Sequence, residues 1–129
     1  MLKTQMKYYV PDIGLSRAIL NRGFHTDRGH ILENVVYLEL KRIGGRLSIG
    51  KVGDKEVDFV HMLPNGNTSY YQVAYSAKET STLERELLPL IKIRDHNPKF
   101  LITTDWEEMN IEGVRVINAY TWLANEGMA

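Results

Sequence analysis

The sequence contains no cysteine, no long apolar run and no net charge. The lack of cysteine excludes a disulfide framework and a thiolate metal site. No apolar segment approaches the roughly 20 residues that a membrane-spanning helix needs, and residues 1–10 lack the apolar region of a secretory signal. These absences favour a cytoplasmic protein that does not enter a membrane.

The balance of charge weighs against strong autonomous binding of nucleic acid. Residues 1–57 carry ten basic against six acidic side chains, and residues 58–129 carry six against ten. Proteins that bind nucleic acid strongly by themselves usually have a basic excess that neutralises phosphates. The chain can present a basic face in its first half, but its total charge predicts no strong binding by the domain alone.

The length and composition predict one globular domain. The 129 residues suffice for a single hydrophobic core, and contents of 43% hydrophobic and 25% charged residues are ordinary for such a domain. The sequence shows no internal repeat, linker or low-complexity run. We therefore expect residues 1–129 to form a single domain.

The segment 55–76, KEVDFVHMLPNGNTSYYQVAYS, predicts a β-hairpin at the centre of the fold. The turn is expected at 64–67, where Asn-Gly accepts the positive φ of a tight turn. The alternation of a first strand, 56–63, is expected to separate Glu56, Asp58, Val60 and Met62 from Val57, Phe59 and His61. The second strand, 69–76, is expected to place on one face Tyr70, Gln72, Ala74 and Ser76.

The remaining segments predict helices and further strands around this hairpin. Helices are expected at residues 13–21, 28–43, about 80–94 and 120–125. Strands are expected at 46–52, 99–105 and 114–119, with a short strand or extended entry at 8–10 and an acidic connection at 106–113. A helix between the hairpin and the later strands supplies the crossover of a mixed sheet, which predicts an α/β or α+β architecture.

The helix expected at 28–43 carries a wide apolar stripe. Its members are Ile31, Leu32, Val35, Val36, Leu38, Leu40 and Ile43. Glu33 shares a face with Tyr37 and Leu40, so we expect it to border apolar surface. The alternative is a surface acid that is favourable near the positive N-terminus of the helix.

One phosphate-binding pattern is excluded by its context. Residues 45–51 match the GxxxxGK start of a P-loop, but Val52 stands where Ser or Thr must hold Mg²⁺. The segment also follows a helix and predicts a strand, whereas a P-loop follows a strand and opens a helix. The chain is therefore not expected to bind ATP.

The order of helix, three strands, helix and strand, with an acid on the helix and acids on the hairpin, resembles the PD-(D/E)XK nuclease core. Five phrases also resemble the domain of unknown function that follows the ATPase core in many prokaryotic AAA+-type ATP-binding proteins. These phrases are YYVPDIGL, RGHILENVVYLEL, GDKEVDFV, YYQVAYS and LLPLIKIRDHNPKFLITTD, within residues 8–123. The resemblance implies a restriction-endonuclease-like α/β fold with a central mixed sheet flanked by helices. It also implies an excised or stand-alone C-terminal module of a larger ATPase.

The resemblance assigns Glu33 to the motif helix, Asp58 to the PD position and Gln72 to the (D/E/Q) position. It implies that such residues bind Mg²⁺ or Mn²⁺ and that a lysine two residues further on orients or deprotonates the attacking water. This chain has Ala74 at that place, which can do neither. Gln72 is a neutral ligand, so we expect weakened metal binding, with Glu56 as a further candidate carboxylate.

Three hypotheses follow for the function. The missing lysine favours a catalytically degenerate nuclease-like domain that serves an AAA+-type ATPase as a nucleic-acid-binding or regulatory module. The second hypothesis is an active Mg²⁺-dependent DNA nuclease in which Lys51, Lys55 or Lys78 supplies the ammonium group. The third is a protein–protein or self-association domain, forming for example a homo-oligomer, that uses the fold as a scaffold.

Two other groups of side chains are weaker candidates. The four histidines lack metal-binding spacing, and His30, three residues before Glu33, is expected to have a capping or surface role. Tyr70, Tyr71 and Tyr75 can stack on bases, but aromatic residues are favoured in strands and packing is the preferred interpretation.

Overall fold

The computed structural model describes the backbone of residues 6–10 and 28–128 and the side chains of residues 28–125. The helix expected at 13–21 lies outside the described residues. The described helices are α2 (Arg28–Ile43), α3 (Thr80–Ile91) and α4 (Ala119–Met128). The described strands are β1 (Met6–Val10), β2 (Arg46–Val52), β3 (Lys55–Met62), β4 (Thr68–Val73), β5 (Lys99–Thr103), β6 (Met109–Ile111) and β7 (Val114–Asn118).

The strands form one seven-stranded mixed sheet in the order β1-β2-β3-β4-β5-β7-β6. Strands β1 to β4 pair antiparallel, β4, β5 and β7 pair parallel, and β6 pairs antiparallel with β7. The crossover from β4 to β5 contains α3, as parallel pairing requires. The expected α/β class, with a central mixed sheet flanked by helices, is confirmed.

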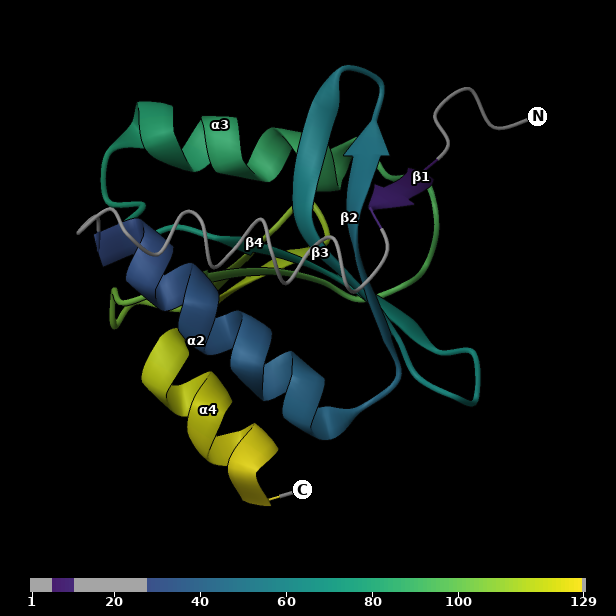
Figure 1. Cartoon of the computed structure of the whole chain (residues 1–129). Helices are drawn as coiled ribbons and strands as arrows, with labels where there is room; N and C mark the ends of the chain where they lie inside the picture. The colour runs from purple at the N-terminus through teal and green to yellow at the C-terminus, as the bar shows by residue number, and fades with distance from the viewer. Residues whose placement is uncertain (1–5, 11–27, 129) are drawn as a thin grey trace.

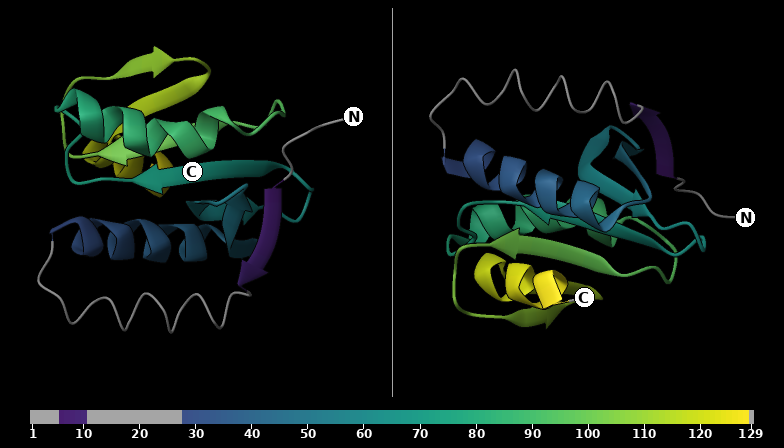
Figure 2. Two further views of the ribbon diagram at one scale, coloured as in Figure 1. Left: turned by 90° about the horizontal axis from the view of Figure 1, so that it is seen from above. Right: turned by 60° about the horizontal axis from the view of Figure 1, so that its bottom comes forward.

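The helices cover the two faces of the sheet unequally. Helix α3 packs on one face, and α2 and α4 lie on the other (Figures 1 and 2). Each face has its own hydrophobic cluster. The cluster under α2 and α4 includes Val36, Leu40, Phe59, Tyr71 and Trp122. The cluster under α3 includes Val57, Val60, Ala74, Leu90 and Leu101.

The alternation predicted along the first hairpin strand is wrong at one point. The register of β2 and β3 shifts between the pairs Ser48–Val60 and Gly50–Val57, so one residue of β2 faces two of β3. This is a β-bulge, and it reverses the alternation of the strand. Val57 and Val60 therefore share the α3 cluster, whereas Phe59 packs under α2. Gly50 lies on β2 at one side of this register shift.

The alternation predicted for the second hairpin strand is confirmed. Tyr70 and Ala74 belong to the cluster under α3, and Tyr71 and Val73 to the cluster under α2 and α4. The strand itself is shorter than expected, since β4 ends at Val73.

The acidic connection expected at 106–113 is wrong in part, because it contains β6. Glu112 and Gly113 have φ of 47° and 86° and form the tight turn between β6 and β7. Two successive positive φ values are typical of hairpin turns. Glu-Gly is a weaker hairpin signal than Asn-Gly, which is why the sequence did not reveal this strand.

Other boundaries and faces also differ from expectation. Helix α3 ends at Ile91 rather than near residue 94, and α4 spans 119–128 rather than 120–125. The stripe on α2 does not face the core throughout, because three of its members are exposed on a second face of the helix. These are Ile31, Val35 and Leu38.

The paired glycines after α2 end the helix as the sequence indicates. Gly44 and Gly45 have φ of 94° and 93°, and a Cβ on Gly45 would clash with the carbonyl oxygen of Met62. Residues 46–52 then form β2, so the rejection of a P-loop is confirmed. Among the described residues, no helix has the length and apolar character to cross a bilayer.

Candidate functional site

Strands β3 and β4 separate at the two hairpin positions predicted to carry the site. Their pairing ends at Phe59 and Tyr71. Beyond this point β4 continues beside β5, where Gln72 pairs with Leu101, and β3 continues beside β2. Asp58 and Gln72 therefore lie next to each other where the two backbones begin to diverge.

Where the two backbones diverge, the side chains of Asp58 and Gln72 make hydrogen bonds that link β3 to β4. The Asp58 N–H donates to Gln72 Oε1 at 2.7 Å, and the Val73 N–H donates to Asp58 Oδ2 at 2.9 Å. Each side chain thus satisfies a backbone donor of the opposite strand, as a ladder bond would. We call these two bonds the Asp58–Gln72 brace.

Gln72 is also held from the side of α3. It is 4% exposed, and its Nε2 donates to the main-chain oxygen of Glu86 at 3.4 Å. The amide oxygen and the amide nitrogen of Gln72 are therefore both engaged within the protein.

A buried acid on α2 and a partly buried acid on α3 flank this region. Glu33, on α2, is buried, which agrees with the expectation that it borders apolar surface. Burial raises the pKa of Glu86, on α3; the charge of Arg85 opposes this rise and the charge of Glu33 adds to it. Glu86 was not among the predicted residues, although its spacing from Leu83 and Leu90 places it on the inner face of its helix.

Replacing Glu86 by glutamine is expected to stabilise the protein at about pH 8 and to lose that advantage at about pH 4. The raised pKa means that the native state holds this proton more tightly than the unfolded chain does. The contribution of Glu86 is therefore favourable below the ordinary pKa of 4.5 and is lost as the pH rises through the folded pKa. Thermal unfolding of Glu86→Gln at both pH values measures the difference, with the exposed Glu84→Gln as control. An equal change at both pH values would contradict the assignment.

Ala74 occupies a core position. It is 9% exposed within the cluster under α3, and its N–H donates to the carbonyl of Ile102 at 3.0 Å. The candidate replacement lysines lie on other parts of the molecule or at its edge. Lys78 lines a pocket with Asp105 and Glu107, and Lys51 pairs across the β2–β3 hairpin with Glu56.

Two of the predicted metal ligands, Asp58 and Gln72, make hydrogen bonds to the backbone of the neighbouring strand. Gln72 Oε1 and Asp58 Oδ2 already accept backbone N–H groups. Within residues 28–125, no group of three or more His, Asp or Glu side chains could hold a metal ion. A hard cation prefers several charged oxygen ligands. In the structure, Asp58 Oδ2 and Gln72 Oε1 make a structural contact between β3 and β4.

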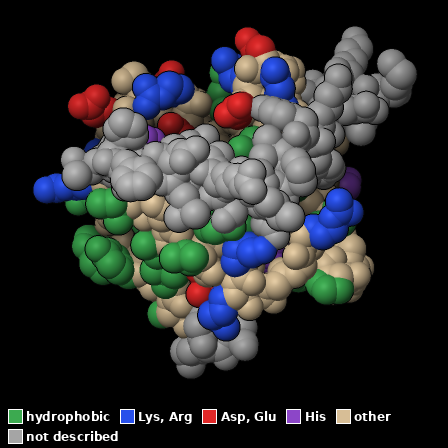
Figure 3. Space-filling view, in the orientation of Figure 1, with side chains coloured by type: hydrophobic (Ala, Val, Ile, Leu, Met, Phe, Trp, Pro, Cys, Tyr) green, Lys and Arg blue, Asp and Glu red, His purple; other side chains and the backbone are tan. Residues whose placement is uncertain are grey.

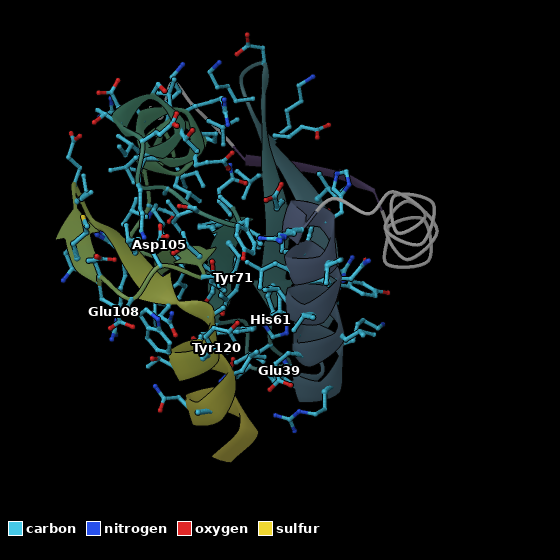
Figure 4. The ribbon with its side chains drawn as sticks, turned by 90° about the vertical axis from the view of Figure 1, so that its left-hand side faces the viewer. Glu39, His61, Tyr71, Asp105, Glu108 and Tyr120 are labelled. Carbon is cyan, nitrogen blue, oxygen red and sulfur yellow. The ribbon has the colours of Figure 1, made fainter. Side chains whose placement is uncertain are left out.

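A second polar group lies at the carboxyl ends of the parallel strands, which Figure 4 views end-on. Asn118, 1% exposed, donates from Nδ2 to the carbonyls of Thr104 and Asp105 at 3.3 and 3.0 Å. Its Oδ1 accepts the Thr121 N–H at 3.0 Å and so caps α4. The Asp105 carboxylate accepts from Ser76 Oγ at 2.9 Å. Ligands often bind at such strand ends, but here the polar groups satisfy one another.

The packing interpretation of two of the tyrosines is confirmed. Tyr70 is buried and its hydroxyl donates to Asp95 Oδ2 at 2.5 Å, while the ring of Tyr71 stacks on Phe100 at 5.2 Å. Tyr75 differs because it is exposed beside the N-terminus of α2, where Arg28 Nη1 donates to its hydroxyl at 3.4 Å. His61 is buried, with Nε2 lying 2.6 Å from the carbonyl of Gly44.

Fold and site together define an α/β protein whose mixed sheet opens between β3 and β4. An uncharacterized protein of Haemophilus influenzae is 37% identical over 124 residues, which cover 95% of this chain and 30% of that protein. The chain thus spans less than a third of the length of this relative. No protein-family model and no solved structure matches the chain.

Proposed function

We propose that this chain is a catalytically degenerate, PD-(D/E)XK-like domain that serves as a nucleic-acid-binding or regulatory module of an AAA+-type ATPase. The observation that carries the proposal is the Asp58–Gln72 brace. The side chains that the resemblance assigns to the PD and (D/E/Q) positions hold the two strands together where they separate, through Asp58 Oδ2 and Gln72 Oε1.

The environment of the missing lysine supports the same proposal. A lysine at position 74 would place its ammonium group at a position that is buried under α3. Burial of an ammonium group without a partner is costly. The alanine at this position is therefore suited to packing.

The length of the relative supports a modular role. The region similar to this chain makes up 30% of the Haemophilus influenzae protein, so a related sequence occurs as part of a longer polypeptide. The proposal assigns an ATPase core to that longer polypeptide and a cytoplasmic setting to both parts. The chain's own balanced charge favours regulation, or nucleic-acid binding assisted by other parts, over strong independent binding.

Thermal unfolding with and without millimolar Mn²⁺ tests the proposal. An ion that binds only the folded state raises the unfolding midpoint. We expect no shift for the parent chain and no Mg²⁺- or Mn²⁺-dependent cleavage of single-stranded, linear or supercoiled DNA. Asp58→Asn is the matched variant, because the amide keeps an acceptor for the Val73 N–H and removes the charge.

A rise of the midpoint with Mn²⁺ that Asp58→Asn abolishes would overturn the proposal. Cleavage that depends on the Asp58 carboxylate would do the same and would favour the active nuclease with a relocated lysine. Lys51→Met, Lys55→Met and Lys78→Met would then identify which lysine supplies the ammonium group.

A further inference from the structure

The face of α2 that turns away from the core forms part of an exposed apolar surface. Figure 3 shows apolar side chains gathered over α2 and α4. The surface consists of six exposed side chains, and we call it the α2–α4 surface. Its members are Ile31, Val35, Leu38, Tyr75, Trp106 and Tyr120. A contiguous group of exposed apolar side chains on a folded protein is often an interaction site.

A pocket of about 220 Å³ opens within this surface between the two helices. Ile31 and Val35 line it from α2, Tyr120 and Leu123 line it from α4, and Tyr75 closes one side. Figure 4 shows Tyr120 between α4 and α2. Pockets that bind cofactors or drug-sized ligands usually have at least roughly 300 Å³. This pocket is better suited to one large side chain of a protein partner.

A side chain of that kind protrudes beside the pocket itself. Trp106 is 72% exposed, and its ring stacks on Tyr120 with centroids 5.6 Å apart and an interplanar angle of 26°. Because Tyr120 also lines the pocket, a projecting indole and a receiving pocket lie next to each other on one surface. A two-fold axis between them lets each of two copies insert its indole into the other.

Charged side chains lie near the pocket and near the indole. Arg28 lies on the rim of the pocket, with its guanidinium carbon 5.5 Å from the centre of the Tyr75 ring. Glu107, which follows Trp106, is exposed and lines a different pocket with Lys78 and Leu83. The acids next to Trp106 also disfavour a phosphate backbone on this face.

We propose that two copies of this chain associate through the α2–α4 surface, with Trp106 of each copy in the pocket of the other. The occupant of the surface is therefore a second copy of the chain. This pairing does not depend on the proposed function of the Asp58–Gln72 region, which lies at the separation of β3 and β4.

Sedimentation velocity of the full chain over a range of concentrations tests the pairing. We expect a reversible monomer–dimer equilibrium whose Kd increases at least about tenfold in Trp106→Ala, because a central tryptophan is a typical interface hot spot. Val35→Glu is expected to give a monomer at every concentration. The control is Leu88→Glu, which changes an exposed leucine of α3 on the opposite face and is expected to leave the Kd unchanged.

Two outcomes separate the proposed pairing from association through another surface. Thermal unfolding verifies that each variant folds. A chain that is monomeric at all concentrations would overturn the proposal. A dimer that survives both Trp106→Ala and Val35→Glu would also overturn it, because its interface would then lie elsewhere.

Discussion

Replacing Asp58 by alanine is expected to lower the free energy of unfolding by about 2 kcal/mol. The variant leaves the Val73 N–H, which now donates to Asp58 Oδ2 at 2.9 Å, without its partner beside the buried cluster under α2. The opposite sign is expected for a metal-binding carboxylate, because removing one acid from a group of acids relieves repulsion in the metal-free protein. Urea denaturation at neutral pH, without divalent ions, measures this difference.

A double-mutant cycle with Gln72→Ala determines whether the two side chains act as one unit. We expect the double variant to be less destabilised than the sum of the single variants, since each bond of the brace holds the same pair of strands. Asp58→Asn should retain most of the stability of the parent. A gain of stability in Asp58→Ala would contradict a bracing role. It would instead favour the hypothesis that Asp58 is a metal ligand.

Replacing Asn118 by alanine is expected to cost about 3 kcal/mol of unfolding free energy, since it removes a helix cap and two buried hydrogen bonds. The side chain links the carbonyls of Thr104 and Asp105, which follow β5, to the Thr121 N–H at the start of α4. Alanine leaves these groups unsatisfied at a position that is 1% exposed. Chemical denaturation followed by far-ultraviolet circular dichroism measures the loss.

The variant Asn118→Asp separates the two contributions of this side chain. Aspartate keeps an acceptor for the cap but directs a carboxylate towards two carbonyl oxygens, so it should also be destabilising at neutral pH. Asn125→Ala, at an exposed position of α4, is the control and should change the unfolding free energy by less than about 0.5 kcal/mol. Similar stabilities of Asn118→Ala and the control would show that the polar junction carries no net stabilisation.

Local patterns predicted most of the fold because they report on single elements. Alternation was sufficient for β4, and paired glycines marked the end of α2. The bulge at Asp58 was not predicted, since it depends on how β3 meets β2, and Gly50 at the register shift does not by itself distinguish a bulge from a regular strand. The exposed face of α2 was equally hidden, because an apolar side chain carries the same signal in a core and on a docking surface.

The sequence predicted which residues lie together at the candidate site, but it did not predict the hydrogen bonds that they make. Asp58 and Gln72 are adjacent as expected, because strand pairing is specified by the turn between them. Their mutual bracing requires the two strands to diverge, which is a tertiary property. Glu86 comes from a helix that is distant in sequence, and only the folded chain brings its main chain to Gln72.

Under the proposed function, the burial of Ala74 bears on how readily a domain of this kind could gain catalytic activity. A lysine at this position would have to disturb the packing under α3, and Asp58 and Gln72 would have to leave the bonds that join β3 to β4. Each of these changes loses stability before any activity is gained. Single substitutions towards a catalytic site would therefore each lower the stability of the domain without a gain in activity. Under the proposed function, the packing of the domain makes the absence of catalytic activity hard to reverse.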